Sequence, residues 1–153
     1  MEPLLHIALV NPQIGPNTGN VGRLCMGIGA ALHLVHPLGF STDDKAVRRA
    51  GLDYWSEVDV TEHENHEAFW KWVGFRRFHL FSTRGQSSHT KIKYQRGDIL
   101  VFGSETKGLP RDWIDEHGAA RIPMKNVMRS LNLSNSVAVV SYTALEQLVP
   151  EWF

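Results

Sequence analysis

Small polar side chains are concentrated near the end of the chain, in the segment RIPMKNVMRSLNLSNSVAVVSY at residues 121–142. This segment joins a short apolar run, residues 119–122, to an amphipathic stretch that begins near Ser134. Such side chains compete with the backbone for hydrogen bonds, so a chain that needed only a core would not gather them between a strand and a helix. We therefore expect chemistry at this junction. Its small polar residues are Ser130, Asn132, Ser134 and Asn135.

A glycine-containing turn follows the apolar run at residues 98–102 and is a second candidate. Gly103 and Gly108 have the spacing of P-loop glycines, but the dipeptide LP replaces the Lys and Ser/Thr of that motif, so triphosphate binding is not expected. The turn can instead bring backbone amides and carbonyls close to a ligand, with Glu105 at its edge. An ordinary strand-to-helix turn explains the motif equally well when it is taken alone.

A third candidate pair, Asn17 and Arg23, follows the first apolar run of the chain. Residues 11–20 contain two Pro, two Gly and three Asn, a composition that predicts no regular structure. Asn17 or Thr18 can cap the helix that follows, and Arg23 interrupts the apolar face of that helix. We expect the Arg23 guanidinium to point into a cleft beyond the strands or to pair with an acid such as Glu105.

Basic residues also cluster in a short helix expected after Ser41 or Thr42. Lys45 shares one face of that helix with both Arg48 and Arg49, an arrangement that can hold phosphates. A solvated, capped surface helix explains the same cluster equally well.

Metal and hydrolase chemistry have little support in the sequence. The tetrapeptide HENH at residues 63–66 misses the HExxH zinc spacing by one residue, and Cys25 is the only cysteine, which fits a reducing compartment. No G-x-S-x-G nucleophile motif occurs. We therefore expect no metal and no acyl hydrolysis.

Alternating strands and helices connect these candidates. Five or six such units predict an α/β fold, with a mainly parallel sheet and helices on both faces. Ligands of such sheets bind beyond the carboxyl ends of the strands, where the loops after residues 10, 102 and 122 are polar or glycine-rich. Residues 82–97 are aperiodic and predict a loop. The expected strands are at residues 4–10, 31–35, 58–60, 77–82, 98–102 and 119–122, and the expected helices begin near residues 17, 42, 65, 111 and 134.

Composition fits a single domain over residues 1–153, with 42% apolar and 21% charged residues. Sixteen basic and sixteen acidic residues leave no net charge, so any nucleic-acid partner must be bound by local patches. The first apolar run is short, is interrupted by His6 and lacks the positive start of a signal peptide. We therefore expect a cytoplasmic protein without a membrane-spanning segment.

Three segments together closely resemble, in order and spacing, the three motifs of the SPOUT family of RNA methyltransferases. They are NTGNVGR at residues 17–23, VFGSETKGLP at 101–110, and IPM at 122–124 with RSLNLSN at 129–135. The stretch DDKAVRRAGLDYW at residues 43–55 is similar to the TrmL/YibK-like group. That group methylates the ribose 2′-hydroxyl of cytidine or uridine at the wobble position, nucleotide 34, of tRNA.

The resemblance implies a C-terminal deep trefoil knot and homodimers that bind the tRNA anticodon loop with both subunits. Tyr142, Leu145, Trp152 and Phe153 can supply the dimer contact, although core packing explains Tyr142 and Leu145 nearly as well. It also implies S-adenosylmethionine as methyl donor, with S-adenosylhomocysteine as product. The donor pocket would be lined by Phe81, Ser82, Thr83, Gly103, Ile122, Met124, Ser130 and Leu131.

Catalytic roles implied by the resemblance fall on Arg23, with Asn17, Glu105 and Asn132 fixing its orientation and the substrate. An arginine has a pKa above about 12 and does not readily accept a proton, so Arg23 is better suited to stabilise a developing alkoxide than to act as a base. RNA contacts would come from Lys45, Arg48 and Arg49. A different RNA target such as ribosomal RNA, and a module that binds donor or RNA without turnover, are the alternatives.

Overall fold

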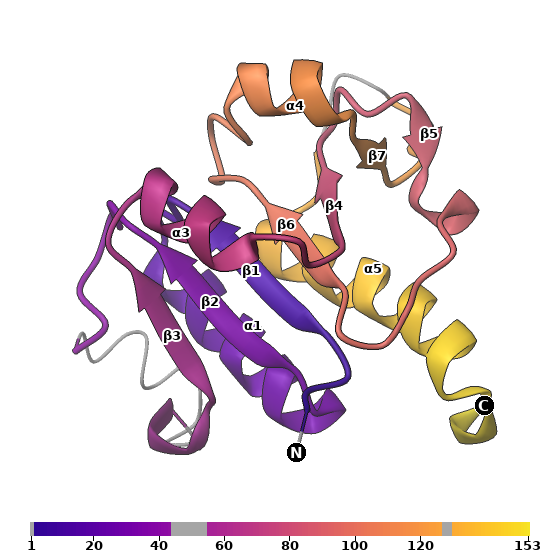
Figure 1. The fold of residues 1–153 in the computed structure, drawn as a ribbon, viewed down its shortest axis with the longest axis horizontal. Coiled ribbons are helices and arrows are strands. Elements are labelled where there is room, and N and C mark those ends of the chain that lie inside the picture. The colour runs from indigo at the N-terminus through magenta and orange to yellow at the C-terminus, as the bar shows by residue number, and fades with distance from the viewer. Residues whose placement is uncertain (1, 44–54, 127–129) are drawn as a thin grey trace.

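The computed structural model describes residues 2–43, 55–126 and 130–153. Within these residues, seven strands form one sheet in the order β3-β2-β1-β6-β4-β7-β5, and every pair of neighbouring strands is parallel (Figure 1). The strands are β1 (His6–Val10), β2 (Ala31–Val35), β3 (Val60–His63), β4 (Phe78–Phe81), β5 (Ser87–Ser88), β6 (Ile99–Phe102) and β7 (Ala120–Arg121).

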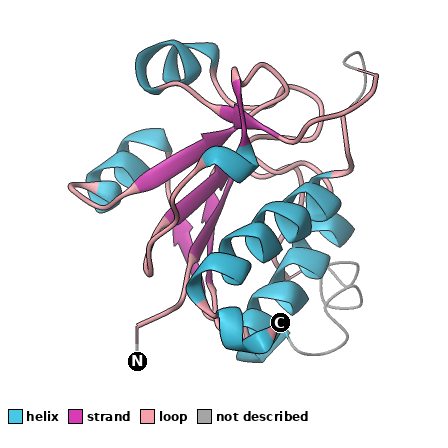
Figure 2. Cartoon of the chain, turned by 90° about the vertical axis from the view of Figure 1, so that its right-hand side faces the viewer, coloured by secondary structure: helices cyan, strands magenta, loops and turns pink. Residues whose placement is uncertain are grey.

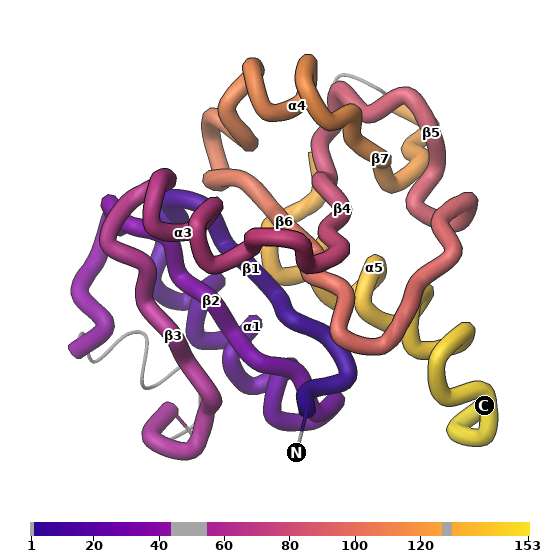
Figure 3. Tube along the Cα trace, viewed as in Figure 1, coloured from indigo at the N-terminus to yellow at the C-terminus, as the bar shows by residue number. Residues whose placement is uncertain are grey.

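Helices cover both faces of the sheet (Figure 2). One face packs against α1 (Gly15–Ile28) and α5 (Leu133–Leu148), and the other packs against α3 (His66–Val73) and α4 (Arg111–His117). The helices α1 and α5 are far apart in sequence but lie side by side (Figure 3). Short 3-10 turns are η1 (Trp55–Glu57), η2 (His89–Lys91) and η3 (Pro150–Trp152).

The central strand β1 shows why these residues form a doubly covered sheet. Ile7 and Leu9 belong to the core under α1 and α5, whereas Ala8 and Val10 belong to the core under α3 and α4. Successive side chains of a strand point to opposite faces, so a continuous apolar run buries both faces at once. The predicted α/β fold with a mainly parallel sheet is therefore confirmed.

Several predicted elements match closely and others are wrong: the strand predicted at residues 58–60 lies at Val60–His63, and part of the stretch predicted to be irregular, residues 11–20, is helical from Gly15. The strand at residues 31–35 and the helix at residues 111–117 have the predicted bounds, and Asn65 caps α3 with a bond from the Ala68 N–H of 2.8 Å. The predicted loop at residues 82–97 instead contains the strand β5 and the turn η2. The predicted cap of α1 is also wrong: α1 begins at Gly15, so Asn17 and Thr18 lie inside the helix.

The start of α1 has a physical explanation. Pro16 stands in the first turn, where its missing N–H does not break a helical hydrogen bond and its fixed φ suits the helix. This placement frees the Asn17 side chain for other contacts. The helix predicted after residue 42, with Lys45, Arg48 and Arg49, lies outside the described residues. The trefoil knot stays a prediction.

Candidate active site

A cavity of about 260 Å³ lies at the carboxyl ends of β4, β6 and β7. These strands are neighbours or near neighbours in a parallel sheet, so the loops that follow them meet at one edge. All eight residues predicted to bind the donor line this cavity. They are Phe81, Ser82, Thr83, Gly103, Ile122, Met124, Ser130 and Leu131.

The walls of this cavity, the donor cavity, combine flat apolar surfaces with about as many polar side chains, Arg84 and Lys107 among them. Phe81 and Phe102 stack with ring centroids 5.1 Å apart and planes inclined by 17°. Leu109 and Ile122 add apolar surface, and hydroxyls and a carboxylate come from the loops after β4 and β6. Apolar faces can hold a purine ring, and the polar side chains beside them can bind a ribose and an amino-acid group. The residues present therefore fit an adenosine-containing cofactor.

Gly103 allows the loop after β6 to fold back on itself. A Cβ at this position would lie 2.0 Å from the Gly108 carbonyl carbon and 2.1 Å from the Leu109 nitrogen. Ser104 and Gly108 form a short antiparallel bridge, in which the Gly108 N–H donates to the Ser104 carbonyl at 2.9 Å. Only a residue without a side chain permits so close a backbone approach. The predicted glycine turn is thus a tight loop that forms one wall of the donor cavity.

Glu105, on this loop, binds the backbone that leads into α1. Its carboxylate accepts hydrogen bonds from the Gln13 N–H at 2.8 Å, the Ile14 N–H at 2.7 Å and the Asn17 side-chain amide at 3.2 Å. The residue before α1, Ile14, provides no side-chain cap of its own. A negative charge near the N-terminus of a helix is favourable, so Glu105 acts as a cap supplied from a different loop.

Asn17 links Glu105 to the loop before α5. The Asn132 amide donates to Asn17 Oδ1 at 3.0 Å, and Asn132 Oδ1 accepts from the Ser134 N–H at 2.9 Å and caps α5. Three of the four predicted catalytic residues therefore form one chain of hydrogen bonds, Glu105–Asn17–Asn132, which we call the loop clamp. It joins the loops after β1, β6 and β7.

Arg23, the fourth predicted catalytic residue, is not part of the loop clamp. It is exposed on α1, and it is not one of the described residues that line the donor cavity. The expected ion pair between Arg23 and Glu105 is wrong for the part of the chain that the structure describes, because Glu105 accepts its bonds from Gln13, Ile14 and Asn17 instead. The predicted RNA contacts Lys45, Arg48 and Arg49 lie outside the described residues.

Sequence reasoning missed Gln13 and Thr106. Gln13 Oε1 accepts hydrogen bonds from the Thr106 N–H at 3.0 Å and from the Thr106 hydroxyl at 2.7 Å. Together with the Gln13 N–H bond to Glu105, these contacts fasten the loop after β1 to the loop after β6. The only available signal was the polar composition of residues 11–20, because no motif connects two residues that lie 93 positions apart.

Other chemistries have fewer groups available. Burial raises the pKa of the Cys25 thiol to about 12, so it stays protonated inside the core. Among residues 2–43, 55–126 and 130–153, no group of three or more His, Cys, Asp or Glu side chains is arranged to hold a metal ion. None of the helices described is long and apolar enough to cross a membrane.

Comparison with known proteins identifies relatives over nearly the whole chain. The model of the SpoU rRNA Methylase family matches residues 4–142. The tRNA (cytidine(34)-2′-O)-methyltransferase of Escherichia coli K12 is 47% identical over 148 residues, which cover 95% of this chain and 94% of the relative. The protein of the same name from Methylovorus glucosotrophus is 48% identical over 147 residues, covering 94% of this chain and 96% of the relative.

Solved structures agree with these relatives. One solved structure, from work on the 2-OH methylation of C/U34 on tRNA, is 40% identical to this chain and superposes with a TM-score of 0.93. The match covers 97% of this chain and 98% of that structure's chain. An AdoMet-bound rRNA methyltransferase from Sinorhizobium meliloti is 25% identical, with a TM-score of 0.87 over 97% of this chain and 58% of its own.

Proposed function

The chain belongs to the SpoU rRNA methylase family, and from this premise we propose that it methylates the ribose 2′-hydroxyl of nucleotide 34, cytidine or uridine, in tRNA. The observation that carries the proposal is the donor cavity, which gathers all eight predicted donor-binding residues beside Glu105. Relatives of nearly the same length, close to half identical in sequence, bear the name of this activity. Since its substrate is tRNA, we also place the protein in the cytoplasm.

S-adenosylmethionine, when bound, supplies a methyl group on a positively charged sulfur that an oxygen nucleophile can attack. Phe81, Ile122 and Leu131 would hold the adenine between apolar surfaces. The hydroxyls of Ser82, Thr83 and Ser130 offer hydrogen bonds to the polar parts of the donor. Gly103 lets the loop that forms one cavity wall fold closely on itself, because a Cβ there would overlap the Gly108 and Leu109 backbone.

Arg23 supplies the positive charge that the reaction requires. A ribose hydroxyl is a poor nucleophile at neutral pH, and it gains negative charge as it attacks. A guanidinium stays protonated, so Arg23 stabilises that charge and can bind an adjacent phosphate instead of taking the proton. The loop clamp, Glu105–Asn17–Asn132, holds the three loops that surround the reacting groups in fixed relative positions.

A homodimer explains how Arg23 reaches a donor cavity that it does not line within its own chain. The C-terminal part of the molecule exposes apolar side chains, with Val139 39%, Tyr142 46% and Phe153 67% accessible, and Met26 of the adjacent α1 is 38% accessible. Such a surface suits contact with a second copy. Of the residues predicted for this contact, Tyr142, Trp152 and Phe153 are exposed, whereas Leu145 is buried in the core.

Mixing two inactive variants tests whether Arg23 acts across the dimer. A dimer of one Arg23→Ala chain and one Gly103→Ala chain contains one intact Arg23 and one intact donor cavity, on different chains. If the arginine of one chain serves the cavity of the other, mixed dimers regain up to half of the wild-type transfer rate per dimer. No recovery, with mixed dimers shown to form, would mean that each chain uses its own arginine.

The proposed activity is tested by methyl transfer from labelled S-adenosylmethionine to a tRNA transcript. The matched substrate carries 2′-deoxyribose at nucleotide 34 and is otherwise identical. Label should appear in the first transcript, at one ribose by nucleoside mass spectrometry, and not in the second. Equal labelling of both would refute the proposal, and labelling of ribosomal RNA alone would refute the tRNA assignment.

A further inference from the structure

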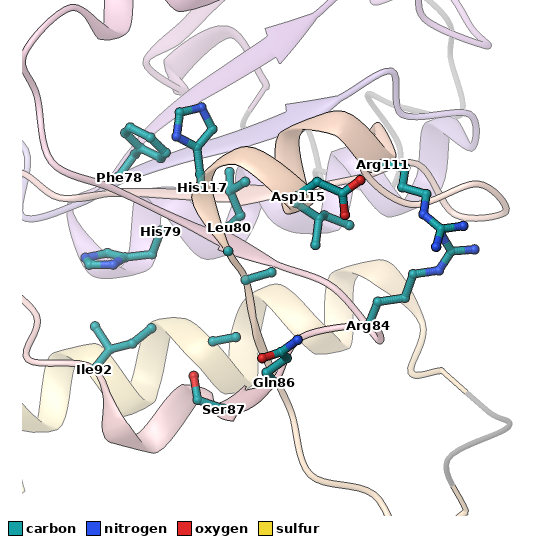
Figure 4. A pocket seen from close by; sticks show the side chains of 14 residues that line it. Phe78, His79, Leu80, Arg84, Gln86, Ser87, Ile92, Arg111, Asp115 and His117 are labelled. Atoms are coloured by element: carbon teal, nitrogen blue, oxygen red, sulfur yellow. The ribbon is translucent and has the colours of Figure 1, made fainter.

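A second cavity, of about 850 Å³, lies between β4, β7 and α4 and adjoins the donor cavity (Figure 4). Arg84 and Ile114 line both cavities, so the two share a wall. Rings from Phe78, His79 and His117 lie toward one end of the second cavity, and arginines lie at the other end (Figure 4). The proposed methyl transfer assigns no role to this space.

The arginine end of the second cavity contains two cations from separate elements. Arg84 lies in the loop after β4, and Arg111 is the first residue of α4. Their guanidinium groups point toward one another (Figure 4). Within the described residues, neither forms an ion pair with a carboxylate, although Asp115 also lines the cavity one turn after Arg111. Two exposed like charges about 4 Å apart repel by only about 1 kcal/mol in water, and an anion between them is attracted by both.

We propose that Arg84 and Arg111 bind a phosphodiester of the substrate RNA, close to the nucleotide that is methylated. Guanidinium groups present paired N–H donors that match the geometry of phosphate oxygens. Because Arg84 lines both cavities, a phosphate held here lies within reach of the donor cavity. The inference deepens the proposed function and depends on RNA being the substrate.

The charges around this pair indicate how much RNA it can bind. The chain has sixteen basic and sixteen acidic residues, so it has no overall attraction for a polyanion and depends on local groups. The helix α4 carries Asp112, Asp115 and Glu116 immediately after Arg111. These acids oppose the passage of RNA along the helix. The pair therefore forms a site for one phosphate and not a track for several.

Arg111→Gln is the most informative variant, because Arg111 lines the second cavity but is not among the described residues of the donor cavity. The matched control is Arg96→Gln, which removes an exposed arginine just before β6, at the opposite end of the sheet. Both variants change the net charge by the same amount. Any difference between them therefore reports the position of the charge.

The measurement is the dissociation constant of tRNA over a series of salt concentrations. Losing one phosphate contact lowers the slope of log K against log salt by about 0.7 to 0.9. Arg111→Gln should show this decrease and bind tRNA roughly tenfold more weakly at low salt, with the affinity for S-adenosylmethionine unchanged. Arg111→Lys, which keeps the charge, should restore most of the slope. Arg96→Gln should match the wild type.

The proposal is overturned if Arg111→Gln and Arg96→Gln have the same slope and affinity. It is also overturned if the loss depends on which base occupies nucleotide 34, because a phosphate contact carries no base information. The wild type is tested for methyl transfer in the same experiment. Transfer by the wild type together with an unchanged Arg111→Gln slope would refute this site alone, whereas absence of transfer to any RNA would refute the proposed function.

Discussion

Two polar networks in this molecule differ in where they sit on the sheet. The loop clamp, Glu105–Asn17–Asn132, joins loops at the carboxyl ends of the strands. The second network, His6–His33–His63, runs across β1, β2 and β3, with nitrogen atoms 2.9 Å apart at both steps, and we call it the histidine row. Trp72 of α3 covers the row, with its ring centroid 4.1 Å from that of His33.

The electrostatics of the histidine row keep its rings uncharged. Burial, and secondarily the neighbouring histidines, lower the pKa of His33 to about 3, and burial also lowers the pKa of His6 and of His63. All three rings are therefore neutral near pH 7. A strongly perturbed pKa is a common mark of an active site, yet here it lies within the strands and away from the donor cavity. Position at the ends of the strands is the better guide in this fold.

Arg23→Ala, on α1 and not in the histidine row, is expected to have the largest effect on methyl transfer. This change should lower methyl transfer about a thousandfold, because it removes the charge that stabilises the attacking oxygen. Affinity for S-adenosylmethionine, measured by calorimetry, should stay near that of the wild type, because Arg23 is proposed to act on the ribose oxygen and not to hold the donor. His33→Gln in the histidine row is the comparison, and it should change stability far more than the rate per folded molecule. Loss of donor binding by Arg23→Ala would show that its role has been misassigned.

Gly103→Ala should produce the next largest effect. A methyl group would overlap the Gly108 and Leu109 backbone, so the loop must move, with a loss of about 3 kcal/mol in the free energy of unfolding and loss of donor binding. Gly27→Ala is the matched control, because a Cβ there meets nothing within 4 Å on the exposed side of α1. That control should be stabilised by up to about 1 kcal/mol. Equal effects of the two substitutions in urea unfolding would contradict this account of the loop.

The histidine row should make stability depend on pH. The pKa of His33 is about 3 in the folded protein, below its usual 6.5, so the unfolded chain binds more protons between these values and the free energy of unfolding falls as the pH falls. At pH 5 the loss from His33 alone is about 2 kcal/mol relative to pH 7.5. Urea unfolding at the two pH values measures it, and His33→Gln should show a smaller difference between them. The same pH dependence in both proteins would mean that His33 does not titrate as described.

Local patterns in the sequence were enough to predict most of the fold. Continuous apolar runs predicted β1, β2 and β6 because strands of a doubly covered sheet bury both faces, and the helix at residues 111–117 was predicted after the glycine turn. The donor cavity was predicted by resemblance, through motifs that lie on loops at one edge of the sheet. The structure brings those eight residues together.

Contacts between distant residues could not be predicted in the same way. His6, His33 and His63 have no ligand spacing, and they meet only because the parallel register places their strands side by side. The cap of α1 was assigned to Asn17 or Thr18 because local rules consider only nearby residues, whereas the cap comes from Glu105, 91 positions after Ile14. The pairing of Gln13 with Thr106 has the same origin.

The smallest expected effect tests whether the loops of the donor cavity need each of their hydrogen bonds. Thr106→Val removes the hydroxyl bond to Gln13, 2.7 Å long, but keeps the backbone bond from the same residue. The free energy of unfolding should fall by about 1 kcal/mol, and methyl transfer should fall several-fold because the loop that carries Glu105 is less firmly held.

The matched control is Thr143→Val on α5, which removes a hydroxyl bond to the Val139 carbonyl, 3.0 Å long, outside the cavity. It should alter stability by a similar or smaller amount and leave the transfer rate unchanged. If both variants reduced transfer equally, the rate would follow overall stability, and the bond between Gln13 and Thr106 would have no special part in positioning the site.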